Sequence, residues 1–147
     1  MIIGDGRITE VGSFQFLGKK NRPQPIHWQQ SDRAIIFPGL IDLHTHLPQY
    51  PVVARGRGQQ LEWQHQHVFP RERNFTGKVG ARESAAFFTE LARHGTTTAA
   101  VFTAIYEDSC DMAFESAANS GMRLIIGQAM MDWDTAGPLQ YRKNAST

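Results

Sequence analysis

A regular alternation of short apolar runs and helical patterns after residue 35 constrains the fold more than any other feature. The segment "IIFPGLIDLHTH" is followed by "ARESAAFFTELARHG", "TTTAAVF", "EDSCDMAFESAANSG" and "MRLIIGQAMM". The longer segments space their apolar residues as helices do and each ends in glycine, whereas the shorter ones are apolar and rich in β-branched residues. In the second helix, Asp108 or Ser109 is expected to cap the start. The order β-α-β-α-β predicts parallel strands joined by helical crossovers, and therefore an α/β fold.

The N-terminal residues and the segment after the first strand lack this alternation of apolar runs and helical patterns. The start, "MIIGDGRITEVGSF", predicts two short strands around the tight-turn pair Asp5-Gly6, and "GKKNRPQPIHWQQSD" predicts a polar loop. From about Leu47 to Gly80 the chain is rich in Gln, Arg, Gly and Pro, with at most a short helix around "QLEWQHQHVF". So long an irregular stretch is typical of an active site or of disorder. The last residues, "DTAGPLQYRKNAST", show no periodicity and are expected to be a loose end.

Composition narrows the class of protein. A net charge of +1 provides no field that would attract nucleic acid or an anionic membrane. No run approaches the ~18 apolar residues of a membrane helix, and the start lacks the pattern of a signal peptide. The single cysteine, Cys110, excludes an internal disulfide and a cysteine-rich zinc site. We therefore expect a cytoplasmic protein with no nucleic-acid or membrane partner.

His44 and His46 finish the first apolar strand and are the strongest candidates for metal ligands. Alternate side chains of a strand point the same way, so two imidazoles at this spacing can converge on one ion. The spacing alone is weak evidence, because 6 histidines in 147 residues produce roughly 0.24 such pairs by chance. Their place at the carboxyl end of a strand in a β/α series strengthens the interpretation. Asp42 shares their face, and either orients a ligand or has a structural hydrogen-bonding role.

A second pair, His65 and His67, lies in the glutamine-rich segment. If that segment is helical, the two rings diverge by about 200° around the helix axis and cannot share an ion. Other chemistries find little support in the residues. There is no Gly-Lys-Ser/Thr phosphate loop, no Gly-x-Ser-x-Gly elbow and no zinc-deaminase signature of the Pro-Cys-x-x-Cys type.

Several motifs in register resemble one family. "PGLIDLHTH" and "HGTTTA" resemble the first-strand and second-strand motifs of the amidohydrolase superfamily. "HTHLPQYP", "LEW", "FPRERNF" and "GTTTAAVFTAIYEDS" are together similar to the guanine deaminases of that superfamily. The resemblance implies a metal-dependent (β/α)8 TIM-type barrel with a small β-sandwich. Residues 1–33 would then be a β-sandwich segment containing the hairpin, and residues 34–147 the first three strands and two helices of the barrel.

The same resemblance implies roles for single residues. His44 and His46 match two ligands of one zinc ion, although another divalent metal is also compatible. His46, Leu47, Pro48 and Gln49 match substrate-lining positions, with Gln49 at the position of the glutamine that recognises the purine. A further set of aromatic residues falls in the loop that would help to wall the base pocket, with ordinary loop packing as the alternative: Trp63, Phe69 and Phe75.

The implied activity is zinc-dependent hydrolysis of guanine to xanthine and ammonia, with no catalytic acid/base residue in this chain. A complete barrel needs about 250 residues, so we expect the remaining ligands and acid/base groups on strands that this chain lacks. A homodimer or a complementing C-terminal chain would supply a partner. Two alternatives stay open: a non-catalytic barrel fragment that acts as an interaction subunit, and another amidohydrolase such as a cytosine deaminase or a chlorohydrolase.

Overall fold

The N-terminal residues form a separate small unit. The computed structural model describes residues 1–20, 33, 35–56 and 58–130, and the chain divides into two compact units, Met1–Ile36 and Phe37–Thr147. In the first unit, strands β1 (Ile2–Gly4) and β2 (Arg7–Glu10) pair antiparallel. Asp5 and Gly6 connect them with φ values of 52° and 71°. Positive φ at both turn residues is what a two-residue hairpin turn requires, so the predicted hairpin is present.

Helix α1 (Phe14–Lys20) follows the hairpin and was not predicted from the sequence. The Oγ of Ser13 accepts a hydrogen bond from the backbone N–H of Phe16, as serine commonly does at the start of a helix. Leu17 is buried, at 3% exposure. A cap and one buried leucine are weak signals within seven residues, which is why periodicity did not reveal the helix. Most of the predicted polar loop lies outside the described residues.

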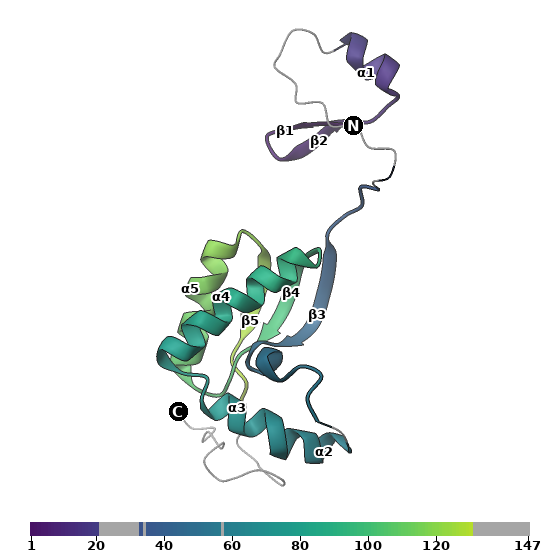
Figure 1. Ribbon diagram of the computed structural model, residues 1–147. Coiled ribbons are helices and arrows are strands. Elements are labelled where there is room, and N and C mark those ends of the chain that lie inside the picture. The colour runs from purple at the N-terminus through teal and green to yellow at the C-terminus, as the bar shows by residue number, and fades with distance from the viewer. Residues whose placement is uncertain (21–32, 34, 57, 131–147) are drawn as a thin grey trace. The chain divides into compact units, whose positions relative to one another are not determined.

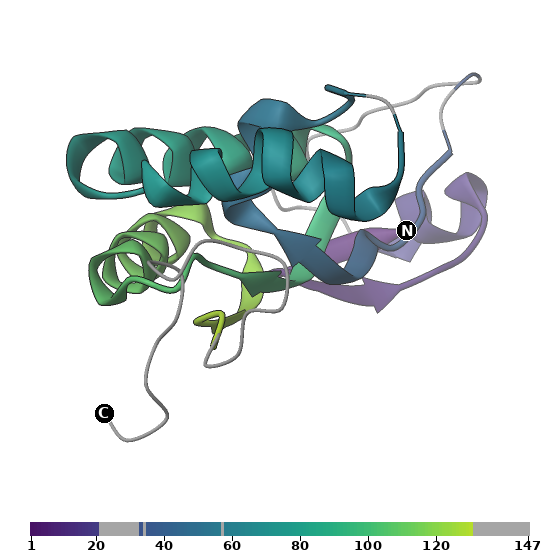
Figure 2. The same ribbon diagram turned by 90° about the horizontal axis from the view of Figure 1, so that it is seen from below.

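The second unit contains a parallel three-stranded sheet with the order β3-β4-β5. Its strands are β3 (Leu40–His46), β4 (Thr96–Phe102) and β5 (Arg123–Gly127). Helices α4 (Gly77–Arg93) and α5 (Glu107–Ser120) form the two crossovers, and Figures 1 and 2 show them packed side by side along the sheet. The parallel α/β architecture predicted from the alternating pattern is therefore confirmed.

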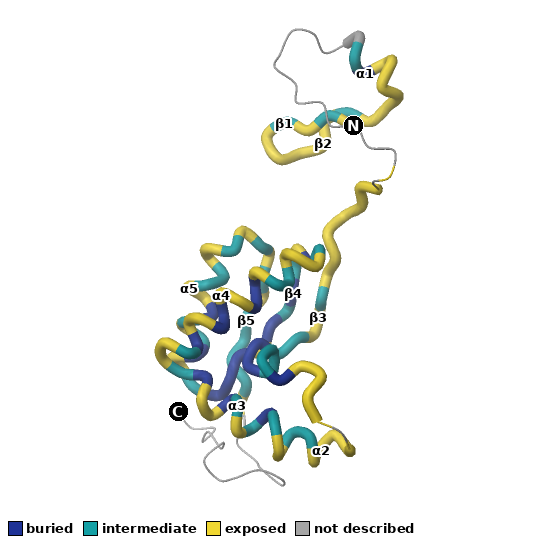
Figure 3. The backbone as a smooth tube through the Cα atoms, viewed as in Figure 1, coloured by how far each residue is buried: buried dark blue, intermediate teal, exposed yellow. Residues whose placement is uncertain are grey.

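The hydrophobic core lies between these two helices and the sheet. Ala99 and Val101 of β4 are 1% and 2% exposed, and Figure 3 shows the buried residues concentrated where α4 and α5 meet the strands. A Cβ on Gly80 would lie 2.7 Å from Cε of Met112, so this glycine allows α4 and α5 to approach closely. The core cluster comprises Leu47, Phe75, Phe87, Phe88, Ala99, Val101, Ala104 and Ala113.

The predicted glycine ends of the two helices are confirmed, whereas the predicted N-terminal cap of the second helix is wrong. Gly95 and Gly121 follow α4 and α5 with φ values of 87° and 70°, as predicted for helix ends. The prediction that Asp108 or Ser109 caps α5 was wrong, because the helix begins at Glu107 with Tyr106 as its N-cap residue. The Oγ of Ser109 instead donates to the backbone oxygen of Tyr106, 2.6 Å away.

The segment after β3 is more helical than the sequence indicated. A 3₁₀ helix, η1 (Leu47–Val52), is followed by α2 (Gln60–Trp63), the π-helical turn η2 (Gln64–Val68) and α3 (Phe69–Arg73). The expectation of at most a short helix around "QLEWQHQHVF" therefore had the right place and underestimated the helical extent. Burial of Val68 at 2% and Phe75 at 0% anchors this segment. Arg71 forms an ion pair with Glu83 of α4, which ties the two helices together.

Strand β3 has one neighbour, β4, within the described residues. Ile41 and Leu43 are 64% and 74% exposed, in contrast to the buried Ala99 and Val101 of the adjacent strand. The described residues contain no helix of the length and apolarity that crossing a membrane requires.

Candidate metal and ligand site

His44 and His46 converge at the carboxyl end of β3. Their Nε2 atoms lie 3.2 Å apart. The register between β3 and β4 shifts between Asp42 and Thr45, so three residues of β3 advance against two of β4. The carboxylate of Asp42 accepts a hydrogen bond of 3.0 Å from the backbone N–H of His44. Asp42 therefore holds the backbone at this irregularity, from which both imidazole rings extend to a common point.

The ring of Phe102 on β4 supports both histidines. Phe102 pairs with His46 in the register of the sheet. Its ring centroid is 5.2 Å from that of His46, in a stacked arrangement, and 5.5 Å from that of His44. Burial, and then the neighbouring His44 ring, lower the pKa of His46 from the usual 6.5. The neutral imidazole, which is the form that ligates metals, is thereby favoured at neutral pH.

The geometry of this pair fits a shared divalent cation. Two nitrogen ligands at 2.0–2.1 Å from zinc, at a tetrahedral angle, lie about 3.3 Å apart. The 3.2 Å separation of the Nε2 atoms matches this requirement. Within the part of the chain that the structure describes, no group of three or more His, Cys, Asp or Glu side chains could hold a metal. The pair therefore fits as part of a ligand set.

The second histidine pair does not join the first. His65 and His67 lie in the π-helical turn η2. The ring of His65 packs edge-on against Phe69, with centroids 5.3 Å apart. A Cβ on Gly56 would lie 2.6 Å from Cδ2 of His67, so that imidazole occupies the space beside the glycine backbone.

A cavity of about 400 Å³ opens next to the His44–His46 pair. Gln49, from η1, and Trp63, from α2, contribute side chains to its wall, together with the aromatic rings of Tyr50 and Phe87. The complete lining is His44, Thr45, His46, Gln49, Tyr50, Val53, Gln60, Trp63, Gln64 and Phe87. Polar amides, imidazoles and aromatic rings thus line one space, a composition suited to a flat, polar heterocycle.

The remaining predicted pocket residues lie outside this lining. Leu47 and Pro48 are fully buried, and the side chain of Leu47 belongs to the hydrophobic core. Phe75 is also in the core at 0% exposure. Phe69 lies against His65 instead. The structure thus brings together the two histidines, Gln49 and Trp63, and directs the other side chains to packing.

Glu72 is a buried acid that the sequence analysis missed. It lies in α3 at 7% exposure. Burial raises the pKa of its carboxyl to about 7, and a hydrogen bond from the side chain of Gln49 acts in the opposite direction. The flanking Arg71 and Arg73 gave this segment the composition of a solvated surface. The signal was the spacing of Val68, Glu72 and Phe75, which is the spacing of one face of a helix and groups the acid with two apolar residues.

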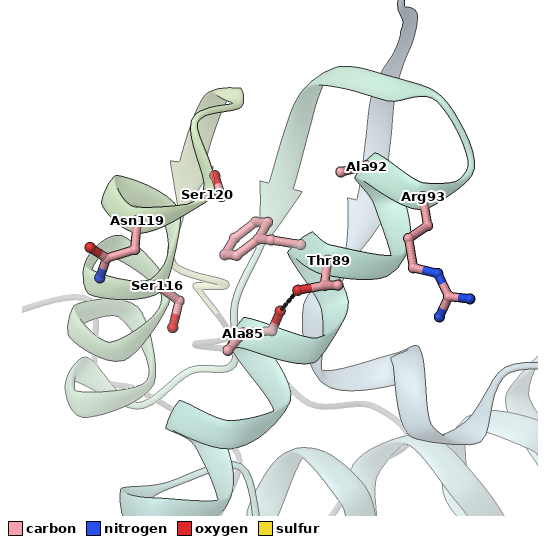
Figure 4. A pocket seen from close by; sticks show the side chains of 8 residues that line it. Ala85, Thr89, Ala92, Arg93, Ser116, Asn119 and Ser120 are labelled. Carbon is pink, nitrogen blue, oxygen red and sulfur yellow. Dashed lines mark hydrogen bonds between the residues drawn. The ribbon is translucent and has the colours of Figure 1, made fainter.

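A second cavity, of about 530 Å³, lies between α4 and α5 (Figure 4). Its polar groups are used within the helices: the hydroxyl of Thr89 donates to the backbone oxygen of Ala85, and that of Ser120 to Ala117. Arg93 forms an ion pair with Glu90. Although this space is larger, its lining contains no convergent set of ligating groups, so the cavity beside the histidines is the candidate functional site.

The chain is similar in sequence and in fold to known proteins. The sequence pattern of the amidohydrolase family matches residues 35–147. Guanine deaminase from Escherichia coli K12 is 39% identical over 133 residues, which are 90% of this chain and 30% of that protein. The structure of guanine deaminase from C. acetobutylicum with guanine bound in the active site superposes with a TM-score of 0.68 at 28% identity, over 73% of this chain and 26% of that one.

A solved atrazine chlorohydrolase from Arthrobacter aurescens TC1, complexed with zinc and atraton, also matches. Its TM-score is 0.56 at 25% identity, over 66% of this chain and 24% of that protein. The chain spans about 30% of the length of the curated relative from E. coli.

Proposed function

Because the chain belongs to the amidohydrolase family, we propose that it is the N-terminal part of a zinc-dependent hydrolase that converts guanine to xanthine and ammonia. The observation that carries this proposal is the convergence of His44 and His46, with Nε2 atoms 3.2 Å apart, beside a cavity that Gln49 lines. The similarity to guanine deaminases, one of them with guanine in its active site, supports this choice of substrate.

The same proposal extends to the whole fold. Residues 34–147 would form the first three strands and two helices of a (β/α)8 barrel, and residues 1–33 a segment of a β-sandwich. The parallel order β3-β4-β5 with helical crossovers supports the barrel, and the exposed Ile41 and Leu43 support a further element beside β3. A complementing C-terminal chain, or a second copy, would then supply what covers them.

Each residue of the site has a proposed part in the reaction. His44 and His46 would hold the divalent cation, which when bound supplies Lewis-acid activation of water for hydrolysis. Asp42 fixes the backbone from which His44 extends. Gln49 would hydrogen-bond the base, and the rings of Tyr50 and Trp63 would exclude water from its faces.

Leu47 and Pro48 would contribute to the substrate site chiefly through the backbone, since their side chains are buried. His46 would contribute as a residue of the cavity lining. Acid/base catalysis is assigned to residues outside this chain.

Two other functions have an observation in their favour. The similarity to the atrazine chlorohydrolase leaves another amidohydrolase substrate open, and Gln49 discriminates, because its replacement by leucine should weaken guanine binding selectively. The exposed apolar residues of β3 favour a non-catalytic interaction subunit. In that case, replacing His44 and His46 would leave association unchanged.

The test measures zinc uptake and guanine turnover in parallel. The purified chain is titrated with zinc, and the absorbance change from guanine to xanthine is followed, both alone and with a chain that supplies the remaining strands. We expect zinc binding by the chain and turnover in the complemented sample, both lost in H44A/H46A. Zinc binding that survives in this variant, or a complemented sample that processes atraton-like triazines but not guanine, would exclude the proposal.

A further inference from the structure

Gln49 and Glu72 belong to different elements that meet behind the cavity. Gln49 lies on η1, directly after the strand that carries His44 and His46, and Glu72 lies on α3, which contacts η1. Gln49 is a lining residue of the cavity, whereas Glu72 is not. The acid is 7% exposed, and the nearby Val68 and Phe75 are 2% and 0% exposed. Glu72 is therefore a buried acid that does not line the cavity but is hydrogen-bonded to Gln49, which does.

The hydrogen bond between these side chains has a definite direction. The two side chains are hydrogen-bonded, and an ionised carboxylate has acceptors only, so the bond that stabilises this form is one donated by Gln49. An N–H of the Gln49 amide is therefore the donor, and a carboxyl oxygen of Glu72 is the acceptor. This uses one of the two amide protons. The carbonyl oxygen and the second N–H of Gln49 remain for a ligand.

An amide without such a partner can rotate by 180° and exchange its donor and acceptor. With one N–H held by Glu72, Gln49 presents an acceptor and a donor side by side. The guanine edge that carries the exocyclic amine has the complementary pattern, an N–H donor next to a ring nitrogen acceptor. A carboxylate behind the amide thus determines which hydrogen-bonding pattern a ligand meets.

We propose that Glu72 is a positioning residue that fixes the orientation of the Gln49 side-chain amide towards the cavity. Its relevance to purine recognition rests on the proposed function, but the hydrogen bond and its effect on the amide can be measured without any ligand. Glu72 is not itself a lining residue of the cavity but is hydrogen-bonded to one that is, so it acts through Gln49.

The experiment follows hydrogen exchange at the Gln49 side-chain amide in the ¹⁵N-labelled 147-residue chain. The resonance is assigned by its loss in Gln49→Leu. We expect one of the two amide protons to be protected in the wild-type chain, and Glu72→Leu to accelerate its exchange about tenfold, as the loss of one hydrogen bond implies. Glu72→Gln keeps an acceptor at the same distance and should restore protection. Glu115→Leu, an exposed acid on α5, should leave the exchange unchanged.

If Glu72→Leu does not fold, Glu72→Asp replaces it, because the shorter side chain keeps the charge and withdraws the acceptor. Unchanged exchange in a folded Glu72→Leu or Glu72→Asp, or acceleration by Glu72→Gln equal to that by leucine, would overturn the inference. Guanine is then added to the wild-type chain as a separate arm. If the Gln49 resonance does not move, the purine assignment fails, while the exchange comparison still decides the role of Glu72.

Discussion

His44-Thr45-His46 and His65-Gln66-His67 share one spacing but lie on different kinds of backbone. On β3 the two Nε2 atoms are 3.2 Å apart. In the π-helical turn η2, residues two apart point in roughly opposite directions. His65 packs against Phe69, and His67 lies beside Gly56. A His-x-His motif can therefore share one metal ion only where the backbone directs both imidazoles to the same point, as β3 does and η2 does not.

The largest expected effect comes from replacing each histidine pair in turn by alanine. H44A/H46A should abolish zinc binding, a loss greater than the ~10–100-fold expected when only an outer partner of a ligand is removed. H65A/H67A should leave zinc affinity within about twofold of wild type, because these rings do not converge. Competition with a chromogenic chelator measures both. Equal losses in the two variants would show that the pairs act together.

The buried Glu72, on the helix that follows the second pair, makes the stability of the chain depend on pH. The folded pKa of Glu72 is raised from 4.5 to about 7, so the folded state favours the protonated acid. Its contribution to stability is fully present below pH ~4.5 and is lost as pH rises through ~7, by about 3 kcal/mol for the whole shift. Urea unfolding at several pH values should show this loss in wild type and not in Glu72→Gln. Glu115→Gln should retain the wild-type profile.

One glycine lies beside His67 and another precedes the strand that carries His44 and His46, and alanine should be costly at both. Gly56 has a φ of 85° and a Cβ there would meet His67, so Gly56→Ala should destabilise the fold by about 1–3 kcal/mol. A Cβ on Gly39 would overlap Thr97 of β4, and Gly39→Ala should cost a similar amount. Only Gly39→Ala should also weaken zinc binding, because it disturbs the strand that carries His44 and His46. A loss of zinc affinity in Gly56→Ala would contradict the separation of the two regions.

The smallest expected effect concerns the ring beside the first pair. Phe102 stacks on His46, and Phe102→Leu should reduce zinc affinity by roughly two- to tenfold, since aromatic pairs contribute about 0.5–1.5 kcal/mol. The comparable change in the second region, Phe69→Leu, should have no effect on zinc. Isothermal titration of both variants provides the comparison. A Phe102→Leu variant with wild-type affinity would mean that the backbone alone orients the imidazoles.

Local sequence patterns predicted the regular strands and helices well. They failed for segments whose helical structure depends on contacts with residues far away in the chain. The strand Thr96–Phe102 and the glycine ends of α4 and α5 were read correctly, because a β-branched run and a helix stop are properties of neighbouring residues. Helix α1 was missed, and the helical stretch from Gln60 to Arg73 was predicted only as at most a short helix. Their short or polar sequences become helical through buried contacts such as those of Leu17 and Val68, which no local window contains.

The sequence by itself determined the parallel α/β order and placed His44 and His46 at the end of a strand. Both follow from periodicity, since alternation and helical spacing are fixed by backbone geometry. Only the tertiary structure decided that the two Nε2 atoms converge and that Phe102 stacks beside them. It also decided that Glu72, 23 positions along the chain from Gln49, lies behind that amide. Contacts between distant segments depend on how helices pack on a sheet, and that packing is a property of the whole chain.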